Sequence, residues 1–260
     1  MKNKVSVFSY PKINLALDIL RKDSSGYHEI QTVFHQLKEP RDEIILEEAE
    51  DGILEVKSDN PKVPTDETNT VLKAALLLKK QMNIKKGARI FIKKRIPLMS
   101  GLGGGSSNAV AALQALARLW GVKCPLLHIA SQIGMDCAFL FSGGTALGEH
   151  FGEKITPLPL LPSRIKIQII DTGVQISSAW AYQNIDIIKC AVDAKKTERL
   201  ICALHRGDEV EVLNNLHNDF EEFIFEKYPA LLKKKREIES KKSGRVFLCG
   251  SGGALVRIYS

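Results

Sequence analysis

Residues 97–108 read Pro-Leu-Met-Ser-Gly-Leu-Gly-Gly-Gly-Ser-Ser-Asn, between a segment expected to be a strand (88–95) and an amphipathic segment expected to be a helix. Four glycines in five positions let the backbone approach a ligand closely with its N–H groups turned inward. The helix expected to begin at Ser106-Ser107 adds unpaired N–H groups and the positive end of its dipole, which suits phosphate. The stretch therefore predicts a phosphate cradle over Gly101 to Asn108, with a hydroxyl of Ser106 or Ser107 available to Mg²⁺ or to a phosphate oxygen.

Two familiar nucleotide loops do not fit these residues. A Walker loop requires Lys followed by Ser or Thr after the last glycine, where this chain has Ser-Ser-Asn. A dinucleotide fingerprint starting at Gly101 requires glycine at position 106, which is Ser106. A flexible turn capped by Ser106 remains the simpler alternative, and it is disfavoured because a turn rarely needs four glycines at the start of a helix.

The surrounding segments mix strands and helices in both halves of the chain, without a regular βαβ alternation, so the fold class expected is α+β. Hydrophobic spacing predicts strands over 5–20 (interrupted at Pro11), 43–48, 52–57, 88–95, 165–170, 246–249 and 254–258. It predicts helices over 70–81, from Ser107 to Trp120, and over 125–134, 178–184, 197–204, 209–215 and 229–241. Residues 137–141 resemble a strand, and three prolines within 156–162 mark the best candidate for a domain boundary.

Composition narrows the classes of protein that fit. The chain has 260 residues, 44% hydrophobic and 26% charged, which is enough for one large or two modest domains. It shows neither an apolar run of roughly 18 residues nor a signal peptide, so a cytoplasmic protein is expected. The five cysteines are scattered, which disfavours zinc clusters and disulfide frameworks. A net charge of +7 favours anionic ligands, and the basic run 233–236 is expected to be a solvated helix face.

The pattern Pro-x-x-x-Gly-Leu-Gly-x-x-Ser-Ser in residues 97–107 resembles the phosphate loop of the GHMP kinases, and the likeness runs from about residue 5 to residue 258. Within this family the chain is most similar to kinases that phosphorylate the 2-hydroxyl of a cytidine diphosphate-linked methylerythritol. Four further stretches carry that resemblance, of which Gly26-Tyr27-His28 is the most specific: Lys12-Ile13-Asn14-Leu15, Gly26 to Phe34, Ile133-Gly134-Met135-Asp136-Cys137 and Gly250-Ser251-Gly252-Gly253.

The resemblance implies a two-domain α+β GHMP kinase fold. Residues 1–156 would form the ATP-binding N-terminal domain, ribosomal-protein-like, with a left-handed βαβ crossover. Residues 163–260 would form a ferredoxin-like C-terminal domain, shorter at its end than in relatives. The active site would lie in the cleft between them.

The resemblance also implies two catalytic residues. Asp136 would orient or deprotonate the substrate hydroxyl, and Lys12 would neutralise the carboxylate and the moving phosphoryl group, because phosphoryl transfer depends mostly on alignment and charge stabilisation. Without the resemblance, Lys12 in an apolar strand is expected to be exposed, and Asp136 to be a helix cap or turn residue.

The remaining site residues follow from matching positions in the family. ATP would contact Asn69, Pro97, Gly101, Leu102, Gly103, Gly104, Gly105, Ser106, Ser107 and Asn108, with Ser107 a possible Mg²⁺ ligand. The cytidine substrate would contact Asn14, Tyr27, His28, Phe34, Ser178 and Tyr182, with stacking on Tyr27 and Tyr182. Read alone, Asn69 is a helix cap, Phe34 a core residue and Tyr182 a helix-packing residue.

The expected function is therefore ATP- and Mg²⁺-dependent phosphorylation of this small molecule in non-mevalonate isoprenoid precursor biosynthesis. We expect no nucleic-acid or membrane partner, and a monomer or weak homodimer. One alternative is a GHMP kinase acting on homoserine or a mevalonate-type alcohol, which would show no preference for cytosine. The other is an inactive or RNA-binding relative, which would bind nucleic acid in a salt-sensitive way.

Overall fold

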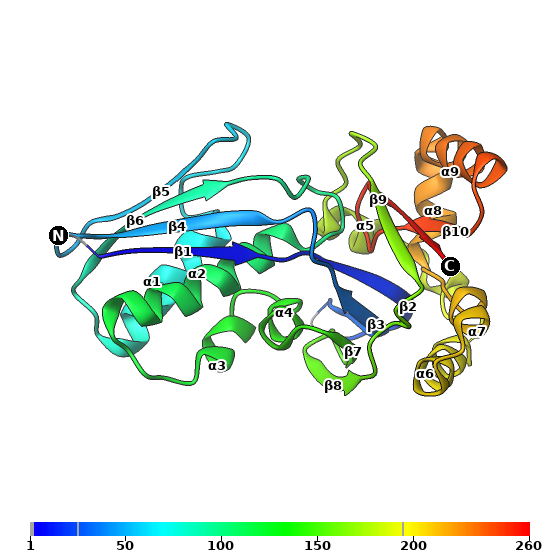
Figure 1. The fold of residues 1–260 in the computed structure, drawn as a ribbon, viewed down its shortest axis with the longest axis horizontal. Helices are drawn as coiled ribbons and strands as arrows, with labels where there is room; N and C mark the ends of the chain where they lie inside the picture. Colours follow the sequence, from blue (N-terminus) through cyan, green and yellow to red (C-terminus); the bar gives the residue numbers. More distant parts are fainter. Residues whose placement is uncertain (1–2, 25, 194) are drawn as a thin grey trace. The chain divides into compact units, whose positions relative to one another are not determined.

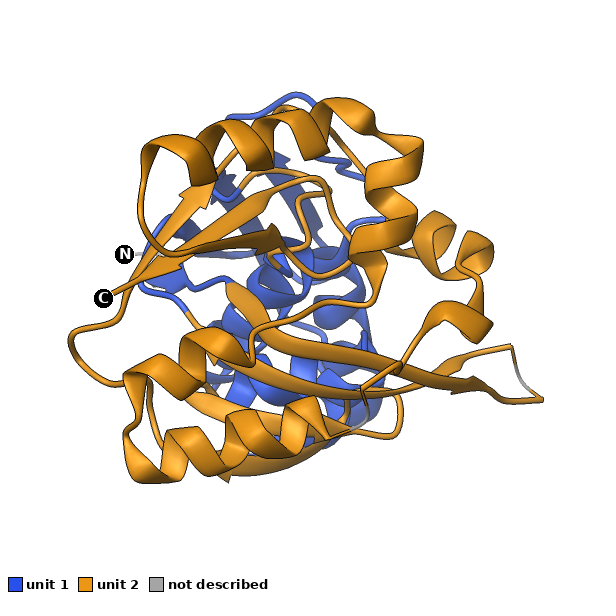
Figure 2. Cartoon of the chain, turned by 90° about the vertical axis from the view of Figure 1, so that its right-hand side faces the viewer, with its two compact units in different colours: residues 1–11, 37–96, 103–142 blue, residues 12–36, 97–102, 143–260 orange. Residues whose placement is uncertain are grey.

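The computed structural model describes residues 3–24, 26–193 and 195–260, which fall into two compact units (Figure 2). Unit 1 comprises residues 1–11, 37–96 and 103–142, and unit 2 comprises residues 12–36, 97–102 and 143–260. Each unit is assembled from separate stretches of chain, and the glycine loop begins in unit 2 and ends in unit 1. The two domains that the family resemblance implies, residues 1–156 and 163–260, stay a prediction.

Unit 1 is a layer of helices on a four-stranded sheet of order β1-β4-β6-β5, in which only the β5–β6 pair is parallel. Figure 1 shows α1 and α2 side by side on one face of this sheet. The strands are β1 (Lys4–Ser9), β4 (Asp42–Ala49), β5 (Leu54–Ser58) and β6 (Gly87–Lys93). The helices are α1 (Thr70–Met82), α2 (Gly104–Trp120), α3 (Leu126–Ser131) and α4 (Cys137–Ser142).

The two long helices of unit 1 begin and end at residues suited to helix ends. The side chain of Asn69 caps α1 by accepting hydrogen bonds from the backbone N–H groups of Val71 and Leu72. Both flanking residues of α2, Gly103 (φ 69°) and Gly121 (φ 72°), are left-handed, a conformation that favours glycine. The predicted helix over 70–81 is confirmed, and so is the one that ends at Trp120, although it begins at Gly104 and not at the serines.

Unit 2 contains two sheets, of order β2-β3-β7-β8 and β10-β11-β9, and every paired strand in them is antiparallel. The strands are β2 (Lys12–Lys22), β3 (His28–Gln36), β7 (Thr145–Glu149), β8 (Lys154–Leu158), β9 (Lys166–Ile170), β10 (Arg245–Leu248) and β11 (Leu255–Tyr259). The helices are α5 (Ser178–Asn184), η1 (Ile187–Lys189), α6 (Lys196–Arg206), α7 (Glu209–Asn214), α8 (Phe220–Lys227) and α9 (Pro229–Lys241). A shared apolar core joins both sheets to α5, α8 and α9; it includes Leu17, Ile19, Phe220, Ile224, Leu248 and Leu255.

One local prediction is wrong, and two further features were not foreseen. Residues 137–141 form helix α4, because a short run of apolar residues fits a buried helix as well as a strand. Pro157, in the proline-rich segment expected to mark a domain boundary, lies in strand β8, at the edge of its sheet, where a missing N–H is tolerated; the boundary itself stays a prediction. Helix α8 was not predicted at all. In the part of the chain that the structure describes, no helix has both the length and the apolar character needed to cross a membrane.

The basic run in α9 lies on an exposed helix face, as predicted, and carboxylates neutralise part of it. Lys234 and Lys241 form ion pairs with Glu237, and Lys235 pairs with Glu221. These pairs weaken the case for a nucleic-acid surface on this helix.

Candidate active site

The end of the glycine loop opens helix α2 in unit 1. Because α2 starts at Gly104, the N–H groups of its first turn have no partner within the helix, which makes this terminus suited to an anion. A Cβ on Gly104 would lie 2.9 Å from Cγ2 of Ile96 and 3.1 Å from Nζ of Lys94. Position 104 therefore has no room for a side chain, whereas Gly105 is exposed and a Cβ there would meet Thr70 at an ordinary 3.4 Å.

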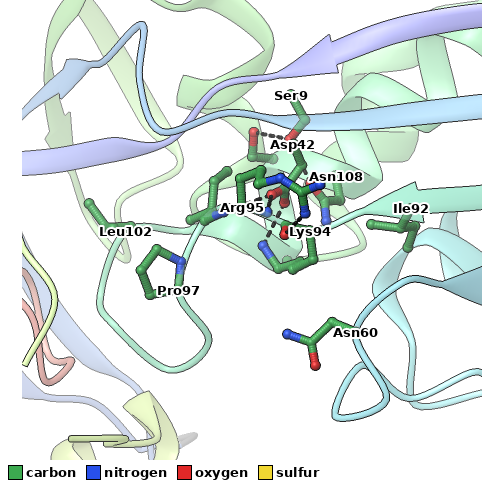
Figure 3. A network of polar contacts seen from close by, with 12 residues as sticks. Ser9, Asp42, Asn60, Ile92, Lys94, Arg95, Pro97, Leu102 and Asn108 are labelled. Carbon is green, nitrogen blue, oxygen red and sulfur yellow. Dashed lines mark hydrogen bonds and ion pairs between the residues drawn. The ribbon is translucent and has the colours of Figure 1, made fainter. Parts of the chain in front are cut away.

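A buried ion pair lies directly beside this terminus, and sequence analysis missed it. Nζ of Lys94 is 2.5 Å from Oδ2 of Asp42, with side chains 4% and 0% exposed. The other carboxylate oxygen of Asp42 accepts hydrogen bonds from the backbone N–H groups of Arg95 (2.6 Å) and Ile96 (2.8 Å). Figure 3 shows the side chains of Asp42, Lys94 and Arg95 gathered at this point. One carboxylate thus fixes both the chain that leads into the loop and the ammonium beneath Gly104.

Burial sets the protonation behaviour of Lys94. Burial lowers the pKa of Lys94 below its ordinary value, and the charge of Asp42 and its hydrogen bond oppose this shift. The sequence offered no signal for the pair, since Asp42 and Lys94 are far apart in the chain and each occurs in a charged stretch.

Ser107 and Asn108 are anchored by β1. The hydroxyl of Ser107 donates to the carbonyl of Tyr10 (2.6 Å) and contacts Oγ of Ser9 (2.7 Å), while Ser9 donates to Oδ1 of Asn108 (2.6 Å). Ser107 is 4% exposed and Ser106 is half-buried. A hydroxyl oxygen is the hard ligand that Mg²⁺ prefers, so both serines have suitable chemistry; the less buried Ser106 has the easier access.

Asn69 and Thr70 bring the start of α1 to the loop. Asn69 is buried and also donates from Nδ2 to the carbonyl of Pro64 (2.5 Å). Oγ1 of Thr70 donates to the carbonyl of Gly105 (2.7 Å). The cap role of Asn69 is confirmed, and its nearness to adenine stays a prediction.

The start of the glycine loop, in unit 2, interlocks with the second glycine turn (250–253). Gly101 has φ +84°, and a Cβ there would lie 1.7 Å from the carbonyl oxygen of Cys249. A Cβ on Gly252 would lie 1.9 Å from the backbone nitrogen of Gly101. The backbone N–H groups of Gly253 and Ala254 donate to the carbonyls of Met99 and Ser100, both at 3.2 Å. Sequence analysis found both glycine turns but not this contact.

Pro97 and Leu102 also belong to this interlocked segment. The carbonyl of Pro97 accepts a hydrogen bond from Oγ of Ser100 (2.8 Å). Leu102 is fully buried, and its carbonyl accepts from the backbone N–H of Lys12 (3.0 Å). The loop start and the start of β2 are therefore held together.

The side chain of Lys12 is held in a defined place inside unit 2. It is 5% exposed, so the exposure expected from its own sequence context is wrong. Its ammonium donates to Oδ1 of Asn14 (2.8 Å) and lies 5.5 Å from the ring centroid of Phe34. A Cβ on Gly250 would lie 3.4 Å from Nζ of Lys12 and 3.0 Å from Oδ1 of Asn14, so the second glycine turn also borders this ammonium. Phe34 is buried, as a core residue would be.

Asp136 lies in the turn that opens α4 in unit 1. It is half-buried, and its carbonyl accepts from the N–H of Leu140 (3.0 Å), so the turn position expected from its sequence is confirmed. The neighbouring thiol of Cys137 is buried, which raises its pKa to about 12 and leaves it unreactive. Lys12 and Asp136 belong to different units, and their pairing stays a prediction.

Residues expected to bind the cytidine group gather in unit 2. The rings of His28 and Tyr182 lie 5.4 Å apart at 33°, and Tyr182 meets the edge of Phe220 at 4.9 Å. Burial lowers the pKa of His28, and the nearby Lys22 acts in the same direction. The helix packing of Tyr182 is thus confirmed, and the His28–Tyr182 contact also suits recognition of a flat base by a neutral imidazole.

Two further predicted substrate residues lie at accessible places. Tyr27 is 54% exposed, with its ring 5.5 Å from that of Phe151. Ser178 is exposed at the start of α5, and its hydroxyl accepts from Oγ of Ser251 (2.7 Å) in the second glycine turn. Asn14 is buried, and both ends of its carboxamide bond to protein groups.

Comparison with known proteins identifies the same family that the sequence motifs resemble. Residues 69–144 match the family described as the GHMP kinases N terminal domain. The chain is 36% identical over 265 residues to 4-diphosphocytidyl-2-C-methyl-D-erythritol kinase of Listeria welshimeri, covering 99% of this chain and 89% of that protein. It is 34% identical over 255 residues to the protein of the same name from Caldicellulosiruptor saccharolyticus, covering 97% and 87%.

Two solved structures have the same fold as this chain. A crystal structure of 4-(cytidine 5'-diphospho)-2C-methyl-D-erythritol kinase superposes with a TM-score of 0.81 at 26% identity, over 98% of this chain and 90% of that one. Phosphomevalonate kinase of Streptococcus pneumoniae, solved with phosphomevalonate and AMPPNP, has a TM-score of 0.72 at 14% identity over 98% of this chain and 92% of that one, which shows a shared fold.

Proposed function

The chain belongs to the family of 4-diphosphocytidyl-2-C-methyl-D-erythritol kinases within the GHMP kinases, and from this premise we propose that it phosphorylates the 2-hydroxyl of 4-diphosphocytidyl-2-C-methyl-D-erythritol with ATP. The likeness to relatives over nearly the whole chain is the observation that carries this proposal. The α+β architecture expected from the sequence is the architecture of this family, and its structural relative has the same fold.

The nucleotide phosphates would lie on the N–H groups that open α2. This terminus has glycines at 103 and 104, with no room for a side chain at 104. Asp42 holds the backbone of Arg95 and Ile96, which leads into the loop. Such preorganised donors stabilise the charge of the transferring group without rearrangement during the reaction. Ser106 or Ser107 would hold Mg²⁺, which, when bound, offsets charge on the phosphate oxygens.

Lys12 and Asp136 would act on the reacting groups. The held ammonium of Lys12 supplies positive charge to the phosphoryl group in transit, and the carboxylate of Asp136 accepts the proton of the substrate hydroxyl. The burial of Lys12 and its bond to Asn14 support this role, because a fixed charge stabilises a transition state better than a mobile one. Cytosine would lie against Tyr182 and Tyr27, with its polar edge toward His28.

A coupled assay of ADP release tests the proposal. With the cytidine substrate, Asp136→Asn should lower kcat by about 10²- to 10⁴-fold while ATP binding, measured by calorimetry, is retained. Asp51→Asn is the matched control: it makes the same chemical change in unit 1, on an exposed turn, and should leave turnover unchanged.

Three outcomes would contradict the proposal. Equal turnover in the parent and Asp136→Asn would remove Asp136 from the mechanism. Absence of turnover by the parent would indicate an inactive relative. Turnover of homoserine or mevalonate without competition by cytidine nucleotides would indicate another GHMP kinase.

A further inference from the structure

A chain of three hydrogen bonds runs inside unit 2 from the ammonium of Lys12 to a backbone carbonyl. Nζ of Lys12 donates to Oδ1 of Asn14 (2.8 Å), and Nδ2 of Asn14 donates to Oγ1 of Thr32 (2.8 Å). Oγ1 of Thr32 in turn donates to the carbonyl of Ala16 (2.6 Å). Thr32 is 0% exposed, and no role was predicted for it from the sequence.

The groups at the two ends of this series of hydrogen bonds determine which atom donates in each bond. A lysine ammonium can only donate hydrogen bonds, and a carbonyl oxygen can only accept them. The single proton of the Thr32 hydroxyl is therefore directed to Ala16, which leaves a lone pair of Oγ1 for the amide of Asn14. Because that amide must present its NH₂ group to Thr32, its oxygen faces Lys12. The hydroxyl of Thr32 thus fixes the NH₂ end of the Asn14 carboxamide, and the ammonium of Lys12 contacts the oxygen end.

The strand geometry brings these side chains together. The β2–β3 register shifts between Asn14 and Ala16, so that Leu15 is an extra residue in β2, and bulges of this kind re-aim neighbouring side chains. On the other side of β3, Thr32 pairs with Gly148, where a Cβ would lie 3.2 Å from Cγ2 of Thr32 and 2.5 Å from Cε2 of Phe34. Because position 148 has no side chain, Thr32 and Phe34 can pack closely against its backbone. This packing holds Thr32 beside Asn14.

We propose that Thr32 is a positioning residue for phosphoryl transfer, acting through Asn14 on the ammonium of Lys12. The proposal rests on the proposed function in one respect, that Lys12 acts on the transferring phosphoryl group. Without the hydroxyl, the NH₂ group of Asn14 is buried without its acceptor, a state that proteins avoid. The carboxamide then shifts to bring its NH₂ group to another acceptor, and its oxygen no longer holds the ammonium of Lys12. The ammonium moves away from its place beside Gly250.

Thr32→Val and Thr32→Ser separate this role from simple packing. Valine keeps the shape and strand preference of threonine and lacks the hydroxyl, whereas serine keeps the hydroxyl. Thr32→Val should lower kcat by about 10- to 100-fold, because a small misplacement of a catalytic group has an effect of this size. The KM for ATP should change by less than about threefold, since the change affects the transition state more than nucleotide binding. Thr32→Ser should restore most of kcat.

A second readout does not depend on activity. The side-chain amide signals of Asn14, assigned in ¹⁵N–¹H spectra by their loss in Asn14→Asp, should shift in Thr32→Val and stay near the parent position in Thr32→Ser. Parent-like kcat in Thr32→Val would overturn the proposal. Equal loss of kcat and equal loss of Tm in both variants would also overturn it, because packing alone would then account for the effect.

The two proposals fail in distinguishable ways. If the parent shows no turnover while the Asn14 signals shift only in Thr32→Val, the orientation of Asn14 by Thr32 stands and the proposed kinase function falls. If the parent turns over and the Asn14 signals are unmoved in Thr32→Val, the kinase function stands and the role of Thr32 falls.

Discussion

Oδ2 of Asp42 lies 2.5 Å from Nζ of Lys94, and both groups are buried beside Gly104, the first residue of α2. The same carboxylate holds two successive backbone N–H groups of the chain that enters the loop. The pair therefore contributes both to the stability of unit 1 and to the position of the chain that leads to α2.

Asp42→Asn should lower the free energy of unfolding by about 3–5 kcal/mol, because it leaves a buried ammonium without its counter-charge. Asparagine keeps an oxygen for the N–H groups of Arg95 and Ile96, so the charge is the main change. Urea unfolding provides the measurement. Adding Lys94→Met should recover part of the loss, and failure to recover any would show that charge is not its cause.

The exposed ion pair next to it supplies the control. Lys93 and Glu43 form an ion pair with side chains 44% and 28% exposed. Glu43→Gln should have a much smaller effect than Asp42→Asn, because water screens an exposed pair. The loss of unfolding free energy in Asp42→Asn should also become smaller as the pH rises. Without Asp42 the pKa of Lys94 falls further below its value in the unfolded chain, so the unfolded state binds more protons than the folded state.

Gly101→Ala should destabilise the protein by at least about 3 kcal/mol, since a Cβ would overlap the carbonyl of Cys249 and the backbone is left-handed. Gly105→Ala should stay within about 1 kcal/mol of the parent, because its Cβ meets only ordinary contacts in a helical turn. Thermal and urea unfolding of both variants test this contrast. Equal stability of the two would contradict the interlocking of the glycine turns.

His35 should make stability depend on pH. Burial lowers the pKa of His35 from 6.5 to about 4, and its Nδ1 lies 2.8 Å from Oγ1 of Thr145. Between these values the unfolded chain binds a proton that the folded chain does not. The contribution is therefore complete above pH 6.5 and is lost as the pH falls toward 4, by at most roughly 3 kcal/mol.

His35→Gln is the comparison for this prediction. The difference in unfolding free energy between parent and variant should change with pH across that window and be constant above it. A difference that is independent of pH from 7 to 4 would rule out a buried neutral imidazole.

Tyr182→Ala should raise the KM for the cytidine substrate by about 10- to 100-fold, because stacking on a base contributes about 1–3 kcal/mol per ring. The KM for ATP should be unchanged. Tyr182→Phe keeps the ring and its contact with Phe220, and should bind substrate nearly as the parent does. A parallel rise in both KM values for Tyr182→Ala would indicate loss of structure rather than of base recognition.

Local sequence patterns predicted the elements whose residues interact with near neighbours. The helix over 70–81 carries its own cap at Asn69 and an apolar face at regular spacing. The helix that follows the loop lacks a side-chain cap, and glycines at both ends marked its limits. The short run from Cys137 to Ser142 is apolar throughout, so its period gave no sign of a helix. Helix α8 lies between a polar segment and Pro229, and its few apolar positions were not recognised.

Long-range contacts could not be predicted in this way. A lysine in an apolar strand is usually exposed, and only the fold shows that Asn14, Phe34 and the turn at Gly250 surround Lys12. The resemblance identified Lys12 but not its surroundings. Asp42 and Thr32 were missed for the same reason: each acts on residues that other strands or loops supply.

The interlocked glycine turns also have a consequence for synthesis of the chain on the ribosome. Residues 249–254 complete the packing of residues 99–101, yet they leave the ribosome long after them. Throughout most of translation the loop start therefore lacks its final support, and a nascent chain released before residue 250 would lack it permanently. Residues 99–101 therefore acquire their complete packing only after strand β10 and the turn that follows it have been made.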